Sequence, residues 1–145
     1  MTLFLSQPRR PGFSILELLI AVIVIAVLAA LALPKYNKTV EETHKREAKS
    51  KLNIIRSAEI IYKIDTKEYY PFTSLADADA DADNVRSVLN IDIHNNEDWS
   101  YSLTASGSGD NAAATAVATR QRGEHINDTI LLNIADGEII SEYNW

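Results

Sequence analysis

An unbroken apolar run near the N-terminus, residues 13–33, constrains this chain more than any other feature. Its only polar residues are Ser14 and Glu17. At the helical rise of about 1.5 Å per residue, a run of this length spans about 31 Å, enough to cross the hydrocarbon core of a bilayer. A carboxylate within such a segment costs about 2.5–3.5 kcal/mol on insertion scales. We therefore expect Glu17 to have a function that accounts for its presence.

The residues before the run predict its orientation. Residues 1–12 carry Arg9 and Arg10 and no acidic residue, and positive charge keeps the flanking segment of a membrane helix in the cytoplasm. A secretory signal peptide begins in the same way, but its apolar region is usually about 7–15 residues long and ends at a small-residue cleavage site. Here the run is longer and continues directly into Pro34 and Lys35. This favours a retained membrane helix over a cleaved signal.

The segment Gly12-Phe13-Ser14-Ile15-Leu16-Glu17 closely resembles the N-terminal processing signal of type IV pilins and type II secretion pseudopilins. The resemblance is specific over residues 9–36 and architectural beyond them. It implies that a prepilin peptidase cleaves between Gly12 and Phe13 on the cytoplasmic face. It also implies that the new N-terminal residue, Phe13, is N-methylated.

Cleavage at this point gives Glu17 a partner. It exposes a charged α-amino group at Phe13, four residues before the carboxylate. In a bundle of such helices, Glu17 of one subunit can meet the Phe13 amine of the next, and a buried ion pair of this kind sets registry more reliably than it adds stability. Glu17 and Phe13 are therefore the predicted assembly residues. The alternative is that Glu17 simply lies at the level of the lipid headgroups.

Charge and cysteine content limit the remaining function classes. Residues 35–68 carry a net positive charge, whereas residues 69–145 are strongly acidic. An acidic distal domain disfavours nucleic acid as a partner, and the basic stretch is interpreted as a solvated helix face near headgroups. The chain has no cysteine, so it lacks the disulfide that closes the C-terminal region of many type IV pilins.

A single long helix is predicted over residues 14–66. Residues 36–64 contain no glycine or proline, and apolar residues recur every three or four positions, namely Tyr36, Val40, Ala48, Leu52, Ile55, Ala58 and Tyr62. Ile54 and Ile61 are expected to widen this stripe. Pro34 is expected to bend the helix or to melt it locally. The amphipathic second half needs an apolar surface to cover its stripe.

That surface is predicted to be a sheet. Residues 99–103 alternate large apolar and small polar side chains, and residues 129–134 and 138–143 also favour strands. Residues 112–120 fit either a strand or a helix, and their small side chains suit a strand packed closely under a helix. Residues 106–111 form a turn cluster, and Asp136-Gly137 predicts a two-residue hairpin of type I′.

The resulting fold class is α+β and pilin-like: one long N-terminal helix, membrane-spanning in its first half, packed on a four-stranded antiparallel meander. The predicted organisation is a leader over residues 1–12, a transmembrane assembly helix over 13–34, and an extracytoplasmic region over 35–145. That last region, which includes the amphipathic half of the helix, has room for one small domain. The segment 68–75, with Tyr70-Pro71 and an expected short helix start at Ser74-Leu75, resembles the exit from the long helix in related proteins.

The repeat at residues 77–84 suggests a cation site. It supplies four weak candidate ligands, Asp77, Asp79, Asp81 and Asp83. An EF-hand beginning at Asp77 requires glycine at position 82 and glutamate at position 88, and the chain has Ala82 and Val88 instead. The favoured interpretation is a solvated loop before a short helix at residues 85–89, with no metal and no other cofactor; loose calcium binding is the alternative.

No catalytic pattern is present, and an enzyme is not predicted. His44, His94 and His125 are scattered, with His44 expected to be exposed, and no metalloprotease, phosphate-loop or hydrolase motif occurs. Three functions compete: a polymer subunit, a membrane-anchored binding module that does not polymerise, and a secreted domain behind a leader. A simple anchor has no use for Glu17 or for Gly12 at the junction, which favours the polymer subunit.

Within that class, the prediction is a subunit of a type IV pilus-like filament, with a major pseudopilin of a type II secretion system as the alternative. The resemblance implies four kinds of partner: other copies of the chain in a helical homopolymer, the prepilin peptidase, an inner-membrane assembly machinery, and the bilayer before assembly. It also implies a single-pass inner-membrane protein with a cytoplasmic N-terminus and a periplasmic domain. The assembled form is then a surface pilus or a periplasmic pseudopilus.

Overall fold

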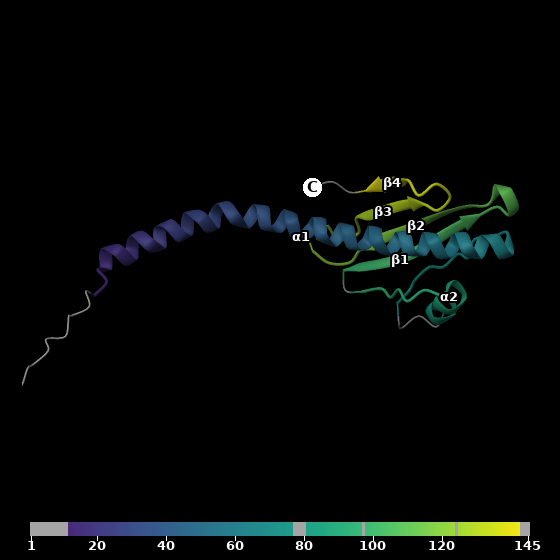
Figure 1. Cartoon of the computed structure of the whole chain (residues 1–145), viewed down its shortest axis with the longest axis horizontal. Coiled ribbons are helices and arrows are strands. Elements are labelled where there is room, and N and C mark those ends of the chain that lie inside the picture. The colour runs from purple at the N-terminus through teal and green to yellow at the C-terminus, as the bar shows by residue number, and fades with distance from the viewer. Residues whose placement is uncertain (1–11, 77–80, 97, 124, 143–145) are drawn as a thin grey trace, which may run out of the picture. The chain divides into compact units, whose positions relative to one another are not determined.

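The computed structural model describes residues 12–76, 81–96, 98–123 and 125–142. These fall into two units that divide between Glu41 and Glu42. Helix α1, Ile15–Thr66, supplies the secondary structure of the first unit and the first element of the second (Figure 1). The second unit continues with α2 (Ala82–Leu89), β1 (Trp99–Ser106), the 3₁₀ turn η1 (Gly109–Asn111), β2 (Ala113–Arg120), β3 (Thr129–Asn133) and β4 (Ile139–Glu142).

Helix α1 confirms the predicted long helix almost to the residue. It ends where Lys67 adopts the left-handed conformation with φ of 66°, and the Lys67 amide donates to the Lys63 carbonyl at 2.9 Å. Pro34 lies inside the helix, so the suggestion of local melting there was wrong. Proline has no backbone N–H, so one hydrogen bond of the helix is missing. The residues on both sides favour helix strongly enough for it to continue past Pro34. The predicted bend at Pro34 stays a prediction.

The four strands form one antiparallel sheet in the order β1-β2-β3-β4, which confirms the predicted meander. The segment that fitted either strand or helix is strand β2, paired with β1 from Trp99 opposite Arg120 to Ser106 opposite Ala113. The outer edge of β1 is partly covered, because Phe72 and Leu103 exchange two backbone hydrogen bonds at 3.1 and 2.8 Å. The outer edge of β4 carries no further strand among the described residues.

One face of the sheet and the second half of α1 share a single hydrophobic core. Leu52 and Ile55 of α1 are fully buried together with Trp99 of β1 and Leu132 of β3. In β2, the buried apolar positions are alanines, at 114, 116 and 118, and the last residue, Arg120, is buried as well. Small side chains at the centre of the sheet let a helix approach closely, as the composition of this segment predicted.

The predicted stripe of α1 was too wide. Ile54 and Ile61 are 48% and 64% exposed and lie outside the core, because the buried face of α1 is a narrow line. That line consists of Ala48, Leu52, Ile55, Ala58 and Glu59. Tyr36 also stays 67% exposed. A helix lying on a flat sheet buries a narrower arc than one surrounded by other helices, so the flanking isoleucines face away.

The β3–β4 connection corrects another prediction. It spans residues 134–138 and is not a two-residue type I′ hairpin, since Gly137 has a positive φ of 80° and Asp136 does not. Ile134 is fully buried, and its amide donates to the Ala114 carbonyl at 3.0 Å. This long-range bond draws Ile134 out of the hairpin and lengthens the loop.

Arg56 of α1 fixes this loop from the helix side. Its Nε donates to the Ile134 carbonyl at 2.9 Å, and its Nη2 donates to the Ala135 carbonyl at 3.3 Å. Gly137 packs against the same guanidinium, so that a Cβ there would lie 2.9 Å from Arg56 Cζ. The loop is therefore shaped around one arginine of α1.

Gly137→Ala should destabilise the domain by about 2–3 kcal/mol. The left-handed conformation costs an alanine about 1–2 kcal/mol, and the added methyl group also displaces Arg56. Gly109→Ala is the matched control, because Gly109 has a φ of 61° but open space where a Cβ would lie. This variant should lose only the free energy that the left-handed conformation costs an alanine. Thermal unfolding of the full chain in detergent compares the two variants; equal losses would contradict the role of Arg56.

Helix α2 extends the short helix predicted at residues 85–89 by three residues. It ends at Asn90, whose left-handed conformation lets its amide cap the Ser87 and Arg86 carbonyls. No helix begins at Ser74-Leu75, contrary to expectation. Instead the Ser74 hydroxyl accepts a hydrogen bond from the Ala76 amide at 3.0 Å, and the Leu75 carbonyl accepts one from the Asn95 amide at 3.0 Å. The second bond ties the segment to the stretch that follows α2.

Candidate processing and assembly site

The predicted site lies at the N-terminal end of α1. Ser14 precedes the first helical residue, and its hydroxyl accepts a hydrogen bond from the Leu16 amide at 3.3 Å. Glu17 falls in the first turn, where the helix dipole favours a negative charge. Gly12 and Phe13 come just before the helix, and a Cβ on Gly12 would meet no atom within 4 Å. The junction therefore stands clear of the rest of the described chain.

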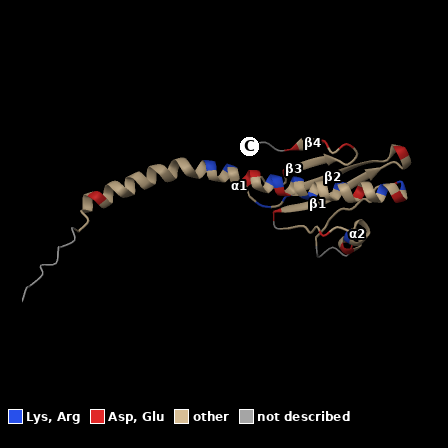
Figure 2. Ribbon diagram, viewed as in Figure 1, with Lys and Arg blue, Asp and Glu red and all other residues tan. Residues whose placement is uncertain are grey.

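The apolar side chains of this segment have no covering within their own subunit. Phe13 is 79% exposed and Ile15 is 87% exposed. Among the described residues, α1 is the helix long and apolar enough to cross a membrane, judged by length and composition. Figure 2 shows that the first half of α1 is almost free of charged residues after Glu17. Lipid or other apolar helices must cover so large an apolar surface.

Glu17 has no hydrogen bond or ion pair within the described residues. The structure thus places Gly12, Phe13 and Glu17 at one helix end, and the Glu17 carboxylate has no partner among the residues that the structure describes. A cation that neutralises Glu17 in an apolar setting has to come from outside those residues. The α-amino group of a cleaved neighbour is the group that the sequence predicted.

The other candidate residues do not form a comparable site. Asp77 and Asp79 lie outside the described residues. Asp81 and Asp83 begin α2: the Asp81 carbonyl accepts from the Val85 amide at 3.0 Å, and the Asp83 carboxylate pairs with Arg86. No group of three or more potential metal ligands is gathered within the described ranges. The predicted solvated loop without a metal and its alternative, loose calcium binding, both stay untested.

The histidines are also separate from one another. His44, expected to be exposed, is partly buried, with Nδ1 3.6 Å from Asp98 Oδ2 at the start of β1. His94 lies beside Asp92 and His125 beside Asp128. Each histidine therefore lies beside a different aspartate.

One buried carboxyl, that of Glu59, was not predicted from the sequence. This carboxyl is fully buried on α1; its Oε2 accepts a hydrogen bond from the Tyr70 amide at 2.9 Å, while its Oε1 has no hydrogen-bond partner among the described residues. Burial raises the pKa of Glu59 to about 7, although the Tyr70 amide opposes this shift. The helical spacing indicated this burial, since Glu59 lies on the same stripe as Leu52 and Ile55.

Comparison with known proteins agrees with the motif. Residues 8–33 match the family described as "Prokaryotic N-terminal methylation motif". The chain is 33% identical over 68 residues to the type IV major pilin protein PilA of Myxococcus xanthus, covering 47% of this chain and 31% of PilA. It is 32% identical over 69 residues to the type II secretion system core protein G of Escherichia coli, covering 48% of this chain and 47% of that protein.

The chain thus spans about half the length, or less, of the curated relatives that it matches. A second core protein G, from Pectobacterium carotovorum, is 31% identical over 64 residues, which is 44% of this chain and 41% of that protein. No solved structure matches the chain. The chain thus carries the prokaryotic N-terminal methylation motif, and over about half of its length it is similar to a type IV major pilin and to type II secretion core proteins G. Its long helix on a four-stranded antiparallel sheet agrees with an α+β pilin-like fold.

Proposed function

We propose that this chain is a structural subunit of a type IV pilus-like filament, assembled through its N-terminal helix. The observation that carries the proposal is Glu17: a carboxylate in the first turn of an exposed apolar helix, with no partner in the described part of its own subunit. In a bundle of cleaved subunits, the Phe13 amine of a neighbour neutralises it. Phe13 is then the processed and methylated N-terminus.

The same proposal assigns the parts of the chain. Residues 1–12 are a leader, residues 13–34 a transmembrane and assembly helix, and residues 35–145 the amphipathic half of the helix with its sheet domain. Arg9 and Arg10 keep the leader in the cytoplasm, which places the sheet domain in the periplasm before assembly. A prepilin peptidase and an inner-membrane assembly machinery are the partners that this route requires.

The second candidate is a major pseudopilin of a type II secretion system, and the core protein G relatives favour it. The two candidates differ in where the polymer is found. Shearing of intact cells releases a surface pilus that contains this chain, whereas a pseudopilus stays in the periplasm. Immunoblotting of the sheared and periplasmic fractions therefore distinguishes them.

Gly12→Val should block processing. The side chain at this position precedes the scissile bond, and open space around Gly12 means that valine meets no steric conflict within the chain. Loss of cleavage would then reflect recognition by the peptidase and not misfolding. Mass spectrometry of the membrane-extracted protein measures the N-terminus, which should be Phe13 in the wild type and should include the leader in the variant. A normal N-terminus at Phe13 in the variant would refute the cleavage assignment.

A further inference from the structure

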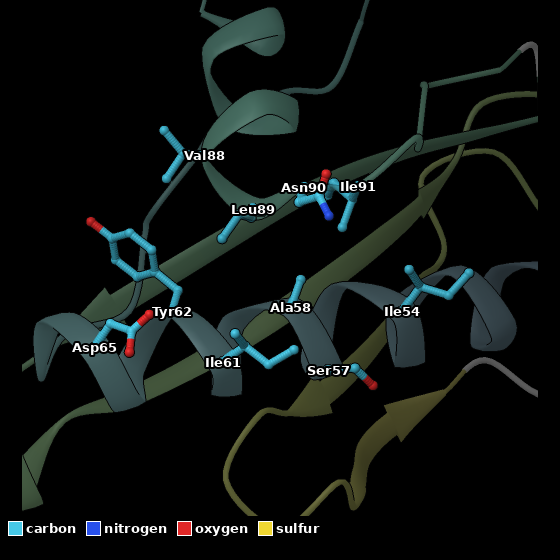
Figure 3. Close-up of a pocket in the computed structure, with 10 residues that line it drawn as sticks. All are labelled: Ile54, Ser57, Ala58, Ile61, Tyr62, Asp65, Val88, Leu89, Asn90 and Ile91. Carbon is cyan, nitrogen blue, oxygen red and sulfur yellow. The ribbon is translucent and has the colours of Figure 1, made fainter.

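An apolar groove lies between the second half of α1 and α2. Its volume is about 340 Å³. Ile54 and Ile61 of α1 and Val88 of α2 form its walls, with Ala58, Leu89 and Ile91 deeper inside (Figure 3). The three wall residues are 48%, 64% and 45% exposed. Three large aliphatic side chains therefore surround a hollow that none of the described residues fills.

A second apolar feature lies at the other side of the same unit. Ile139 and Ile140, adjacent in β4, are 40% and 58% exposed. The segment after α2 borders β1, since Asn95 Oδ1 accepts a hydrogen bond from the Tyr101 amide at 2.9 Å, whereas β4 is the opposite edge strand of the sheet. Figure 1 shows α2 near β1 and away from β4. The groove thus lies near the β1 edge of the sheet and the isoleucine pair lies at the β4 edge.

We propose that, in the filament, the groove of one subunit receives Ile139 and Ile140 of β4 from a neighbouring copy. This inference rests on the proposed function. Two different patches near opposite edges of the sheet make a heterologous contact, which continues into an open helical assembly when its rotation does not close a ring. A filament needs a contact of this kind, and a closed dimer does not.

The size of the groove favours a second copy over a free partner. A hollow of about 340 Å³ holds one or two aliphatic side chains, far less than an independent interface that buries about 1,200–2,000 Å². Subunits whose α1 helices are already packed together meet at a high effective concentration, so a small contact is then sufficient. Ile54 and Ile61 also lie two turns apart on α1, so the contact extends along the helix that assembles the filament.

The absence of cysteine from the sequence makes a direct test possible. Val88→Cys and Ile140→Cys are introduced together into the full chain, filaments are produced in cells, and the sample is oxidised and run on a non-reducing gel. The double variant should give a ladder of trimers and larger oligomers, because each subunit bridges to two neighbours. Either single variant should give dimers at most.

The matched control combines Val88→Cys with Ile126→Cys. Ile126 is a similarly exposed isoleucine, at 53%, in the β2–β3 connection, and this pair should give no ladder. Filament yield under reducing conditions checks that every variant still assembles. If the first pair does not assemble, Ile61→Cys with Ile139→Cys replaces it.

Two outcomes separate this contact from the proposed function. Normal filaments without a ladder, or an equal ladder from the Ile126 control, would overturn the contact alone. If the wild-type chain forms no filament, the proposed function fails and this contact fails with it.

Discussion

Glu17→Ala should abolish filament assembly while the chain is still cleaved after Gly12 and inserted into the membrane. Removal of the carboxylate leaves the Phe13 amine of each neighbour buried without a partner. Such a loss costs about 3–5 kcal/mol, which is more than a hundredfold in the equilibrium constant for adding a subunit. Because filament growth repeats that step at every subunit, the polymer should disappear and not merely shorten.

The measurement is the filament yield from a strain whose only copy of the chain carries the variant, with mass spectrometry of the N-terminus alongside. Ser14→Ala is a suitable control, since it removes the neighbouring polar side chain but leaves the proposed ion pair intact. Glu17→Gln should behave like alanine, because the amide keeps the shape and loses the charge. A wild-type yield of filaments from Glu17→Ala would contradict the proposal that Glu17 sets the registry of the subunits.

Glu59→Gln should make the stability of the domain nearly independent of pH between 5 and 8. In the folded chain the pKa of Glu59 is raised from 4.5 to about 7, so the native state holds a proton that the unfolded state has released. Stability therefore falls as pH rises through this window. The difference in the free energy of unfolding between its two ends is about 3 kcal/mol. The glutamine has no charge to bury and can still accept from the Tyr70 amide.

Thermal or denaturant unfolding of the full chain in detergent, at several values between pH 5 and 8, measures this slope. Glu142→Gln is the control: hydrogen bonding to Lys49 lowers the pKa of Glu142, so that group titrates below the window and the slope should stay as in the wild type. A wild-type slope in Glu59→Gln would show that this carboxyl is already ionised when buried.

Much of this fold follows from local sequence patterns. The range of α1 was predictable because it lacks breakers on either side of Pro34 and because its apolar spacing is helical from Ala48 onward. The strands were predictable from alternation, as in Trp99, Tyr101 and Leu103. The β3–β4 turn was not, because its geometry depends on contacts of Ile134 with Ala114 and Arg56, which lie far away in the sequence.

The candidate site divides in the same way. Gly12, Phe13 and Glu17 belong to one contiguous motif, so a single sequence was enough to select them. The burial of Glu59 and the position of the groove depend on which arc of α1 the sheet covers. The width of that arc was overestimated from the sequence. Ile54 and Ile61 were counted as core because helical periodicity gives the direction of a stripe and not its width.

The alanines of β2 have a consequence for the subunit that the proposed filament would repeat. Ala114, Ala116 and Ala118 belong to the core that the sheet shares with the second half of α1, and their small methyl groups let the two layers lie close together. Larger side chains at these three positions would hold the sheet further from the helix that it packs on.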